Sequence, residues 1–255
     1  MTASRWMVSM AALSMALCCR PGVVEAQERS YEEMRAEVGR LFEAEGYEEA
    51  AALLEDALDR YPDQLLANVT NLAIVRLRLN DPEGSLQALS YGLDHGVWFS
   101  VYAFRPEFWA PLRELPAWGN FQARNEAARS SAQEDVEPRL EVTLPDGYDP
   151  GRRYPLFLAL HGGGENLENF MPAWRSPRLQ AEFIVAYPQS SQLVAMDGFS
   201  WTEDVALSMV EIRRAYEQVL NDYPVDPREI VVGGFSSGGI AALEVALQDV
   251  LPLKG

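Results

Sequence analysis

The sequence predicts two consecutive domains: an all-α helical-repeat domain and, after it, an α/β domain built on a parallel sheet. Three observations support this prediction. Helical patterns in the first half recur after about 34 residues. The second half alternates short apolar runs with helical patterns, which is typical of strands joined by crossover helices. Near the end, a Gly-Phe-Ser-Ser-Gly-Gly segment at 234–239 joins one such run to an Ala- and Leu-rich helix.

The composition indicates a globular and strongly acidic protein. The 255 residues are 48% hydrophobic and carry a formal net charge of -17, which is enough apolar material for one large or two modest domains. Phosphate binding relies on clustered Lys and Arg side chains, and the sequence shows no basic patch. We therefore expect no nucleic-acid partner.

Residues 1–26 have the pattern of an export signal. Arg5 supplies a positive start, residues 6–17 an apolar stretch, and residues 24–26 a small-residue cleavage site. The apolar stretch is short for spanning a bilayer, so an uncleaved membrane anchor is the less favoured alternative. The cysteines at 18 and 19 leave a lipoprotein open as well. We expect cleavage after residue 26, a secreted or periplasmic product, and no membrane association after cleavage.

Residues 27–130 are predicted to form the helical domain. In the stretch 45–62 the small side chains of Ala50 and Ala57 allow close contact between helices, and a weaker copy of the pattern follows at 80–93. The pattern resembles the tetratricopeptide repeat. This resemblance implies a helical module that recruits a protein partner. A plain amphipathic helical hairpin is the alternative.

Two helix starts carry the spacing of a capping box, in which the side chains of two residues satisfy each other's backbone amides. Ser30 and Glu33 form the first of these, at the start of the helical domain. Ser200 and Glu203 form the second, before a helix expected at about 201–220.

Residues 131–255 are predicted to form the α/β domain. A short strand is expected at 141–144, and the apolar runs at 155–160, 183–187 and 230–233 are expected to be strands as well. The last three are continuous apolar runs, the kind buried on both faces of a sheet. Strands that alternate with helices indicate a parallel sheet with right-handed crossovers.

A G-x-S-x-G pattern between a buried strand and a helix is typical of a nucleophile elbow. Ser236 is the candidate nucleophile, rather than Ser237, because only Ser236 has a glycine two residues before it and another two residues after it. Those glycines, Gly234 and Gly238, supply the missing side chains that a strained strand-to-helix turn requires. The backbone amide of Ser237, at the start of the helix, is a candidate oxyanion donor.

A second glycine-rich segment, His161-Gly162-Gly163-Gly164, directly follows the strand expected at 155–160. Glycines let backbone amides approach a ligand closely, as an oxyanion loop demands. Gly163 is the first choice of donor, with Gly162 and Gly164 as its neighbours, and His161 is expected to be a structural ring rather than a base. Either motif alone could be a tight structural turn, but the two together, in this order, are far more specific.

With both motifs in place, residues 136–255 resemble the α/β-hydrolase fold and, within it, exported esterases such as polyhydroxybutyrate depolymerases, feruloyl esterases and phospholipase/carboxylesterase-like enzymes. The turn at 144–149, the Tyr-Pro-Gln-Ser segment at 187–190 and the Val-Asp-Pro-Arg-Glu-Ile run at 225–230 add to the resemblance. It implies that Ser236 attacks the carbonyl of a small or polymeric ester and forms an acyl-enzyme that water hydrolyses. It implies no metal and no cofactor.

The resemblance also implies a catalytic Asp or Glu and then a His, both on loops after further strands that follow the nucleophile. This sequence contains two histidines, His95 and His161, and both precede Ser236. Asp249 is expected to be a solvated charge rather than the triad acid. We therefore expect a hydrolase domain that is incomplete at its C-terminus, with little or no activity from this chain alone.

Two other functions remain open at this point. In the first, the helical repeats recruit a protein partner and the hydrolase part is a non-catalytic remnant. In the second, the elbow belongs to a serine peptidase like prolyl oligopeptidase, because that class shares the same motif. Only a panel of substrates separates the peptidase from the esterase.

Overall fold

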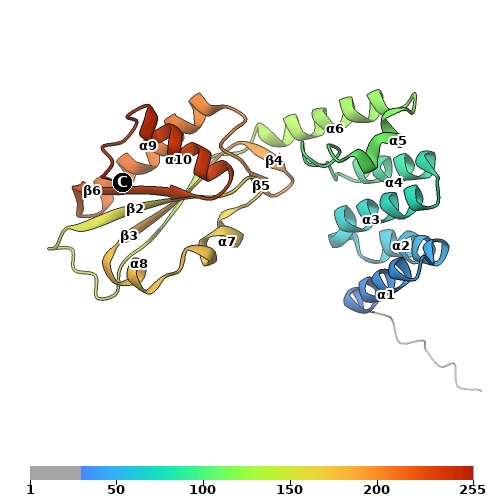
Figure 1. Ribbon diagram of the computed structural model, residues 1–255, viewed down its shortest axis with the longest axis horizontal. Coiled ribbons are helices and arrows are strands. Elements are labelled where there is room, and N and C mark those ends of the chain that lie inside the picture. The colour runs from blue at the N-terminus through green and yellow to red at the C-terminus, as the bar shows by residue number, and fades with distance from the viewer. Residues whose placement is uncertain (1–29, 255) are drawn as a thin grey trace, which may run out of the picture.

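The structure is a computed structural model that describes residues 30–254. The export signal predicted at residues 1–26 lies outside this range. Figure 1 shows the helices of the first half on one side, the sheet with its covering helices on the other, and α6 leading from one to the other. Within the described range, no helix combines the length and the apolar character that a membrane span requires.

Six α-helices form the first half of the described chain, with short 3-10 turns between some of them. In chain order these elements are α1 (Tyr31–Glu43), α2 (Tyr47–Arg60), η1 (Pro62–Gln64), α3 (Leu65–Arg78), α4 (Pro82–Asp94), η2 (Glu107–Trp109), α5 (Ala110–Arg113) and α6 (Trp118–Gln133). Each of α1 to α4 packs against the next along the chain. Ala50 and Ala57 are fully buried in their shared core, so the small side chains allow the close helix contacts expected from the sequence. The domain boundary drawn from the sequence at 130/131 falls inside α6.

The first capping box is confirmed. The Ser30 hydroxyl accepts a hydrogen bond from the Glu33 amide at 3.2 Å, and the Glu33 carboxylate accepts one from the Ser30 amide at 2.9 Å. These reciprocal bonds fix the start of α1.

The second capping box is wrong. Helix α9 (Val205–Asp222) begins later than expected, and Asp204 caps it by accepting a hydrogen bond from the amide of Leu207 at 2.9 Å. Tertiary partners explain the difference. The Ser200 hydroxyl lies 3.0 Å from that of Thr202, and the Glu203 carboxylate accepts the hydroxyl of Tyr102 from the helical part.

The main sheet has four strands in the spatial order β1-β3-β2-β6. Their bounds are β1 (Arg139–Thr143), β2 (Tyr154–Leu160), β3 (Ile184–Gln189) and β6 (Val225–Gly234). Strand β2 pairs in parallel with both β3 and β6, which confirms the parallel arrangement for these three strands. Strand β1 differs from the prediction because it runs antiparallel to β3.

Helices cover both faces of this sheet. Leu158 of β2 packs into the core beneath α9 and α10 (Ser237–Leu247), whereas its neighbour Ala159 packs into the core beneath α7 (Leu167–Phe170). Successive side chains of a strand point to opposite faces, so this alternation places the two cores on the two sides of β2. The remaining short elements on the second side are η3 (Met171–Trp174) and α8 (Pro177–Glu182).

A small antiparallel hairpin lies between the helical part and the main sheet (Figure 1). It consists of β4 (Leu193–Ala195) and β5 (Gly198–Phe199). The apolar side chains of Leu193 and Phe199 form one buried cluster with Trp98 from the helical part. The sequence analysis did not predict this hairpin, because its strands are only three and two residues long.

Candidate active site

Ser236 lies in the sharp turn between β6 and α10, with its side chain exposed to solvent. Its backbone has φ 51° and ψ -117°, a conformation that side chains with a Cβ rarely adopt. Holding such a residue costs on the order of 1–3 kcal/mol. A strained serine presented at the end of a strand is the geometry of a nucleophile elbow.

Two glycines make this turn possible. A Cβ on Gly234 would lie 2.3 Å from the carbonyl carbon of Gly238, and a Cβ on Gly238 would lie 2.2 Å from the carbonyl oxygen of Leu160. Both contacts are with backbone atoms, which cannot move aside as a flexible side chain can. The glycines expected from the G-x-S-x-G pattern therefore allow the elbow to close on itself and on the end of β2.

The His-Gly-Gly-Gly loop follows β2, and its three glycine amides have different roles. The Gly162 amide donates to the Glu165 carboxylate at 2.6 Å, and the Gly164 amide donates to the carbonyl of Phe199 at 2.8 Å. The Gly163 amide, between them, has no acceptor among residues 30–254, and Gly163 is exposed. Of the three candidates, Gly163 alone is therefore free to donate to a ligand, while its neighbours hold the loop.

Gly163 lies beside the start of α10. A Cβ built on Gly163 would lie 3.5 Å from the Ser237 hydroxyl oxygen, and Ser237 is the first residue of α10, where backbone amides have no partner within the helix. The loop that carries Gly163 therefore lies against the first residue of α10, directly after Ser236. Preorganised amide donors stabilise the charge that develops on a carbonyl oxygen under attack.

His161 is fully buried and bonded through both ring nitrogens. Its Nδ1 lies 2.8 Å from the carbonyl oxygen of Gly162, and its Nε2 accepts the amide of Ser190 at 3.2 Å. The ring is therefore a neutral Nδ1–H tautomer. Burial lowers the pKa of His161, while the Gly162 carbonyl and the Glu165 charge act in the opposite direction. This arrangement agrees with the structural role expected for the ring.

His95 is also engaged away from the elbow. It follows α4 in the helical part, where its Nδ1 lies 2.8 Å from the carbonyl of Tyr91 and its ring stacks on the Tyr91 ring. Asp249 is exposed beyond the end of α10. Among residues 30–254, the structure therefore brings no histidine to Ser236, and both histidines of the chain fall in that range.

Two residues of the site were missed by the sequence analysis. Glu165 holds the amide of Gly162, and Phe199 holds the amide of Gly164. A carboxylate three residues after a loop glycine is a weak local signal for the first contact. The second contact depends on a residue far along the chain, so no local pattern indicates it.

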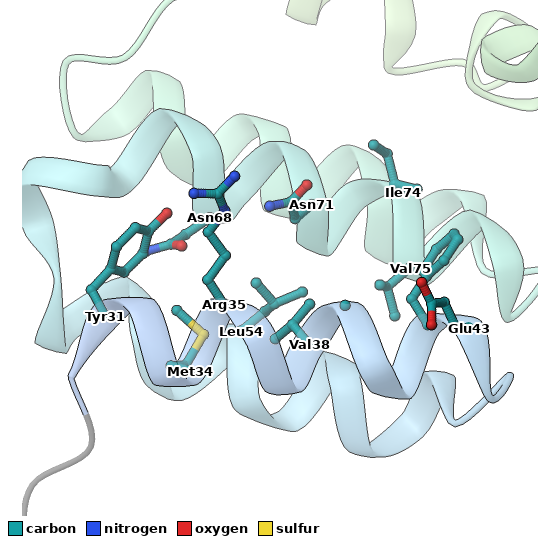
Figure 2. A pocket seen from close by; sticks show the side chains of 12 residues that line it. Tyr31, Met34, Arg35, Val38, Glu43, Leu54, Asn68, Asn71, Ile74 and Val75 are labelled. Atoms are coloured by element: carbon teal, nitrogen blue, oxygen red, sulfur yellow. The ribbon is translucent and has the colours of Figure 1, made fainter.

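A separate pocket of about 410 Å³ lies in the helical part. Figure 2 shows side chains of α1 facing those of α3 across it, with Leu54 of α2 between them. Asn68 lines this pocket and is buried. Its amide nitrogen donates to the carbonyl of Ala57 at 3.3 Å, but its carbonyl oxygen has no partner among residues 30–254. A buried acceptor without a partner is costly and points to a missing donor.

No protein-family model and no curated protein matches the chain. The chain is similar to a solved structure of an uncharacterized protein from Bacillus cereus ATCC 10987, with 19% identity over 88% of this chain and 71% of that one, at a TM-score of 0.37.

Two further solved structures are similar to less than half of the chain. One is a thermostable esterase, with 21% identity over 46% of this chain and 36% of that one, at a TM-score of 0.32. The other is a phospholipase/carboxylesterase from Dyadobacter fermentans DSM 18053, with 17% identity over 45% of this chain and 55% of that one, at a TM-score of 0.33. The match spans only about a third of the former and about half of the latter. At such low TM-scores these likenesses carry no argument, so function is inferred below from the geometry of the site.

Backbone strain at Ser236 gives a first prediction. Glycine adopts the observed φ without a Cβ penalty, so Ser236→Gly is expected to be about 1 kcal/mol more stable than Ser236→Ala. Both variants lack the hydroxyl, and the comparison therefore isolates the backbone. The measurement is the free energy of unfolding in urea. In the control pair Ser131→Gly and Ser131→Ala, on α6, glycine should be the less stable by about 0.5–1 kcal/mol. If the glycine variant were less stable than the alanine variant at position 236, as it is expected to be at position 131, the strain at Ser236 would be contradicted.

Burial of neutral His161 gives a second prediction. Its pKa in the folded protein lies below the ordinary value of 6.5, so the unfolded chain binds the proton more readily. The neutral ring therefore contributes stability above pH 6.5, and that contribution is lost as the pH falls from 6.5 through the folded pKa. We expect ring ¹⁵N shifts of His161 to report mainly the neutral Nδ1–H tautomer at pH 6.5, where a free imidazole is half protonated, and the free energy of unfolding to fall as the pH drops below 6.5. A mainly cationic ring at pH 6.5 would contradict the assignment.

Proposed function

We propose that this chain carries the nucleophile and the oxyanion hole of a serine hydrolase that cleaves carboxylic esters through an acyl-enzyme on Ser236. The observation that carries the proposal is the strained, exposed Ser236 in a turn against which the Gly163 loop packs. We propose that the amides of Gly163 and Ser237 form the oxyanion hole. In this reaction the Ser236 oxygen attacks the ester carbonyl, and the carbonyl oxygen becomes an oxyanion. The two amides donate hydrogen bonds to that oxyanion. When this tetrahedral intermediate collapses, the ester C–O bond breaks, the alcohol leaves with a proton, and the acyl group stays on the Ser236 oxygen. Water then attacks the acyl carbonyl, which releases the acid and restores the Ser236 hydroxyl.

Among residues 30–254, no histidine is in a position to act as the base that takes the proton of Ser236. A serine hydroxyl is a weak nucleophile without such a base. We propose that polypeptide outside the described residues supplies it, and that the 255-residue chain alone has little activity. Export to the periplasm or the medium, as the pattern of residues 1–26 predicts, belongs to the same proposal.

Two features, one of β6 and one of α10, support the proposal that additional polypeptide supplies the base. Among residues 30–254, strand β6 pairs with β2 alone, and the Lys254 amide donates to the Ile230 carbonyl at 2.7 Å. On α10, adjacent to β6, the side chains of Ile240, Leu243 and Leu247 are exposed. An open strand edge beside an exposed apolar helix face is a ready template for further polypeptide. Polypeptide added there would lie next to the elbow.

Ester cleavage gives a third prediction. The 255-residue chain should release p-nitrophenol from p-nitrophenyl acetate only slowly, because the oxyanion hole acts without a base. Added imidazole should raise the rate of the wild-type chain beyond the rate of Ser236→Ala in the same buffer, because imidazole can take the proton of Ser236. Ser131→Ala on α6 is the control and should behave as wild type.

Two outcomes would contradict parts of this proposal. If Ser236→Ala matches wild type at every imidazole concentration, Ser236 is not the nucleophile. If wild type turns over rapidly without imidazole and Ser236→Ala does not, the chain has its own base. A parallel panel of peptide substrates separates the esterase from a prolyl-oligopeptidase-like peptidase, the alternative that shares the elbow.

A second function is favoured by the pocket in the helical part. We propose that this part is a tetratricopeptide-like module that binds a polypeptide segment of a protein partner. Asn71 lines the pocket, and its side-chain amide can donate to and accept from the backbone of that segment. Arg35 and Glu43 also line the pocket, and can contact polar groups of the same segment. If the hydrolase part is a non-catalytic remnant, this binding would be the main activity of the chain.

Peptide binding gives a fourth prediction. Peptides selected from a random displayed library should lose affinity for Asn71→Ala, because Asn71 lines the pocket without sharing the hydrogen bond that holds Asn68. Loss of one hydrogen bond corresponds to a roughly fivefold weaker Kd. Asn120→Ala, an exposed asparagine on α6, is the control. Selected peptides that bind Asn71→Ala and wild type equally would contradict a site in this pocket.

A further inference from the structure

The helical part is bonded directly to the backbone of the β4–β5 hairpin. Gln133, the last residue of α6, uses both ends of its side-chain amide. Its Nε2 donates to the carbonyl of Ser191 at 2.7 Å, and its Oε1 accepts the amide of Leu193 at 2.8 Å. The Leu193 carbonyl in turn accepts a hydrogen bond from Arg129 Nη1 at 3.2 Å. These bonds satisfy the edge of β4 in the way that a neighbouring strand would.

An apolar contact strengthens the same junction. Trp98, which follows α4, is 5% exposed and packs against Leu193 and Phe199 of the hairpin. Near it, the amide of Val101 donates to the carbonyl of Val194 at 3.1 Å. A buried tryptophan contributes a large apolar contact area. Both strands of the hairpin are therefore anchored on the helical part.

The hairpin holds the oxyanion loop on its other side. The Phe199 amide donates to the Glu165 carbonyl at 3.0 Å, and the Gly164 amide donates to the Phe199 carbonyl at 2.8 Å. Residues 165 and 199 thus form an antiparallel bridge. A Cβ on Gly198 would lie 2.5 Å from the carbonyl oxygen of Gly164, so the glycine at 198 permits this close approach. The two residues after Gly163 are held by β5.

A continuous series of contacts therefore leads from α6 to the free amide of Gly163. We propose that Gln133 and Trp98 are positioning residues for the oxyanion hole, acting through the β4–β5 hairpin on Gly164 and Glu165. The helical part is then a structural component of the active site as well as a binding module. This inference rests on the proposed function for the role of Gly163, while the mechanical coupling itself can be tested separately.

The physical reason is preorganisation. An oxyanion donor stabilises developing charge only if its amide is already held close to the required geometry. Gly163 lies between two other glycines, and glycine restricts the backbone least. The loop therefore depends on outside contacts for its shape. Glu165 supplies one of these on the Gly162 side, and Phe199 supplies the other on the Gly164 side.

Amide hydrogen exchange of the full chain tests the coupling without any need for turnover. In Gln133→Ala, we expect the amides of Gly164 and Phe199 to exchange about five- to thirty-fold faster than in wild type, because the anchor of the hairpin loses two hydrogen bonds. Amides of β2 should be unchanged. Gln122→Ala is the matched control, since Gln122 is exposed on the same helix and its side chain makes no hydrogen bond within residues 30–254.

A second variant keeps the shape of the side chain. Gln133→Glu retains an acceptor for the Leu193 amide but places an oxygen against the carbonyl of Ser191. It should also speed exchange at Gly164 and Phe199, by less than Gln133→Ala. In the ester assay with imidazole, both variants should lower kcat with little change in KM, because Gly163 acts on the transition state.

Two results would overturn the inference. If Gln133→Ala speeds exchange at Leu193 but not at Gly164, the helical part stabilises the hairpin without affecting the oxyanion loop. A uniform increase that includes β2 would show that Gln133 serves global stability only. The two proposals can fail separately. If Ser236 is not the nucleophile, the ester assay of Ser236→Ala reveals it, while the effect of Gln133→Ala on exchange at Gly164 remains.

Discussion

The geometry of the candidate site depends on one close backbone contact, between Gly238 at the start of α10 and the carbonyl of Leu160 at the end of β2. Any Cβ at position 238 would lie far inside the normal contact distance of that oxygen. Because β2 and β6 are parallel neighbours, their carboxyl ends meet at one edge of the sheet. The contact then brings the loop after β2 against the turn after β6. Without it, the loop that carries Gly163 would not lie against Ser237 at the start of α10.

The sequence predicted the parts of this site that short-range chemistry determines. Gly234 and Gly238 were expected from the requirements of a tight turn, and the structure gives each a specific backbone clash that glycine avoids. The strands β2, β3 and β6 were expected from continuous apolar runs, the pattern of strands buried on both faces. Strands β2 and β3 lie inside the sheet, whereas β6 is its edge among residues 30–254, and Val231 and Val232 are only half-buried. His161 was expected to be structural, and its burial with both nitrogens bonded agrees with that role.

The parts that sequence reasoning missed depend on partners distant along the chain. Ser200 and Glu203 have the spacing of a capping box, but Tyr102 from the helical part takes the Glu203 carboxylate. Gly162 and Gly164 were grouped with Gly163, although only tertiary bonds to Glu165 and Phe199 distinguish them. The direction of β1 was also missed, since a run of alternating burial is the same in either direction. In each case the local sequence pattern is compatible with two local structures, and a contact with a residue distant along the chain determines which of them forms.

The strain at Ser236 bears on whether the elbow is a remnant. A serine at φ 51° costs on the order of 1–3 kcal/mol, a sizeable fraction of the stability of an ordinary domain. Glycine at the same position would avoid most of that cost, and no described contact of the Ser236 side chain offsets it. The conformation persists because Gly234, Gly238 and Leu160 fix the backbone on both sides. An exposed residue held in a strained conformation contributes little to folding, and this is why the proposed function assigns a role to the Ser236 hydroxyl.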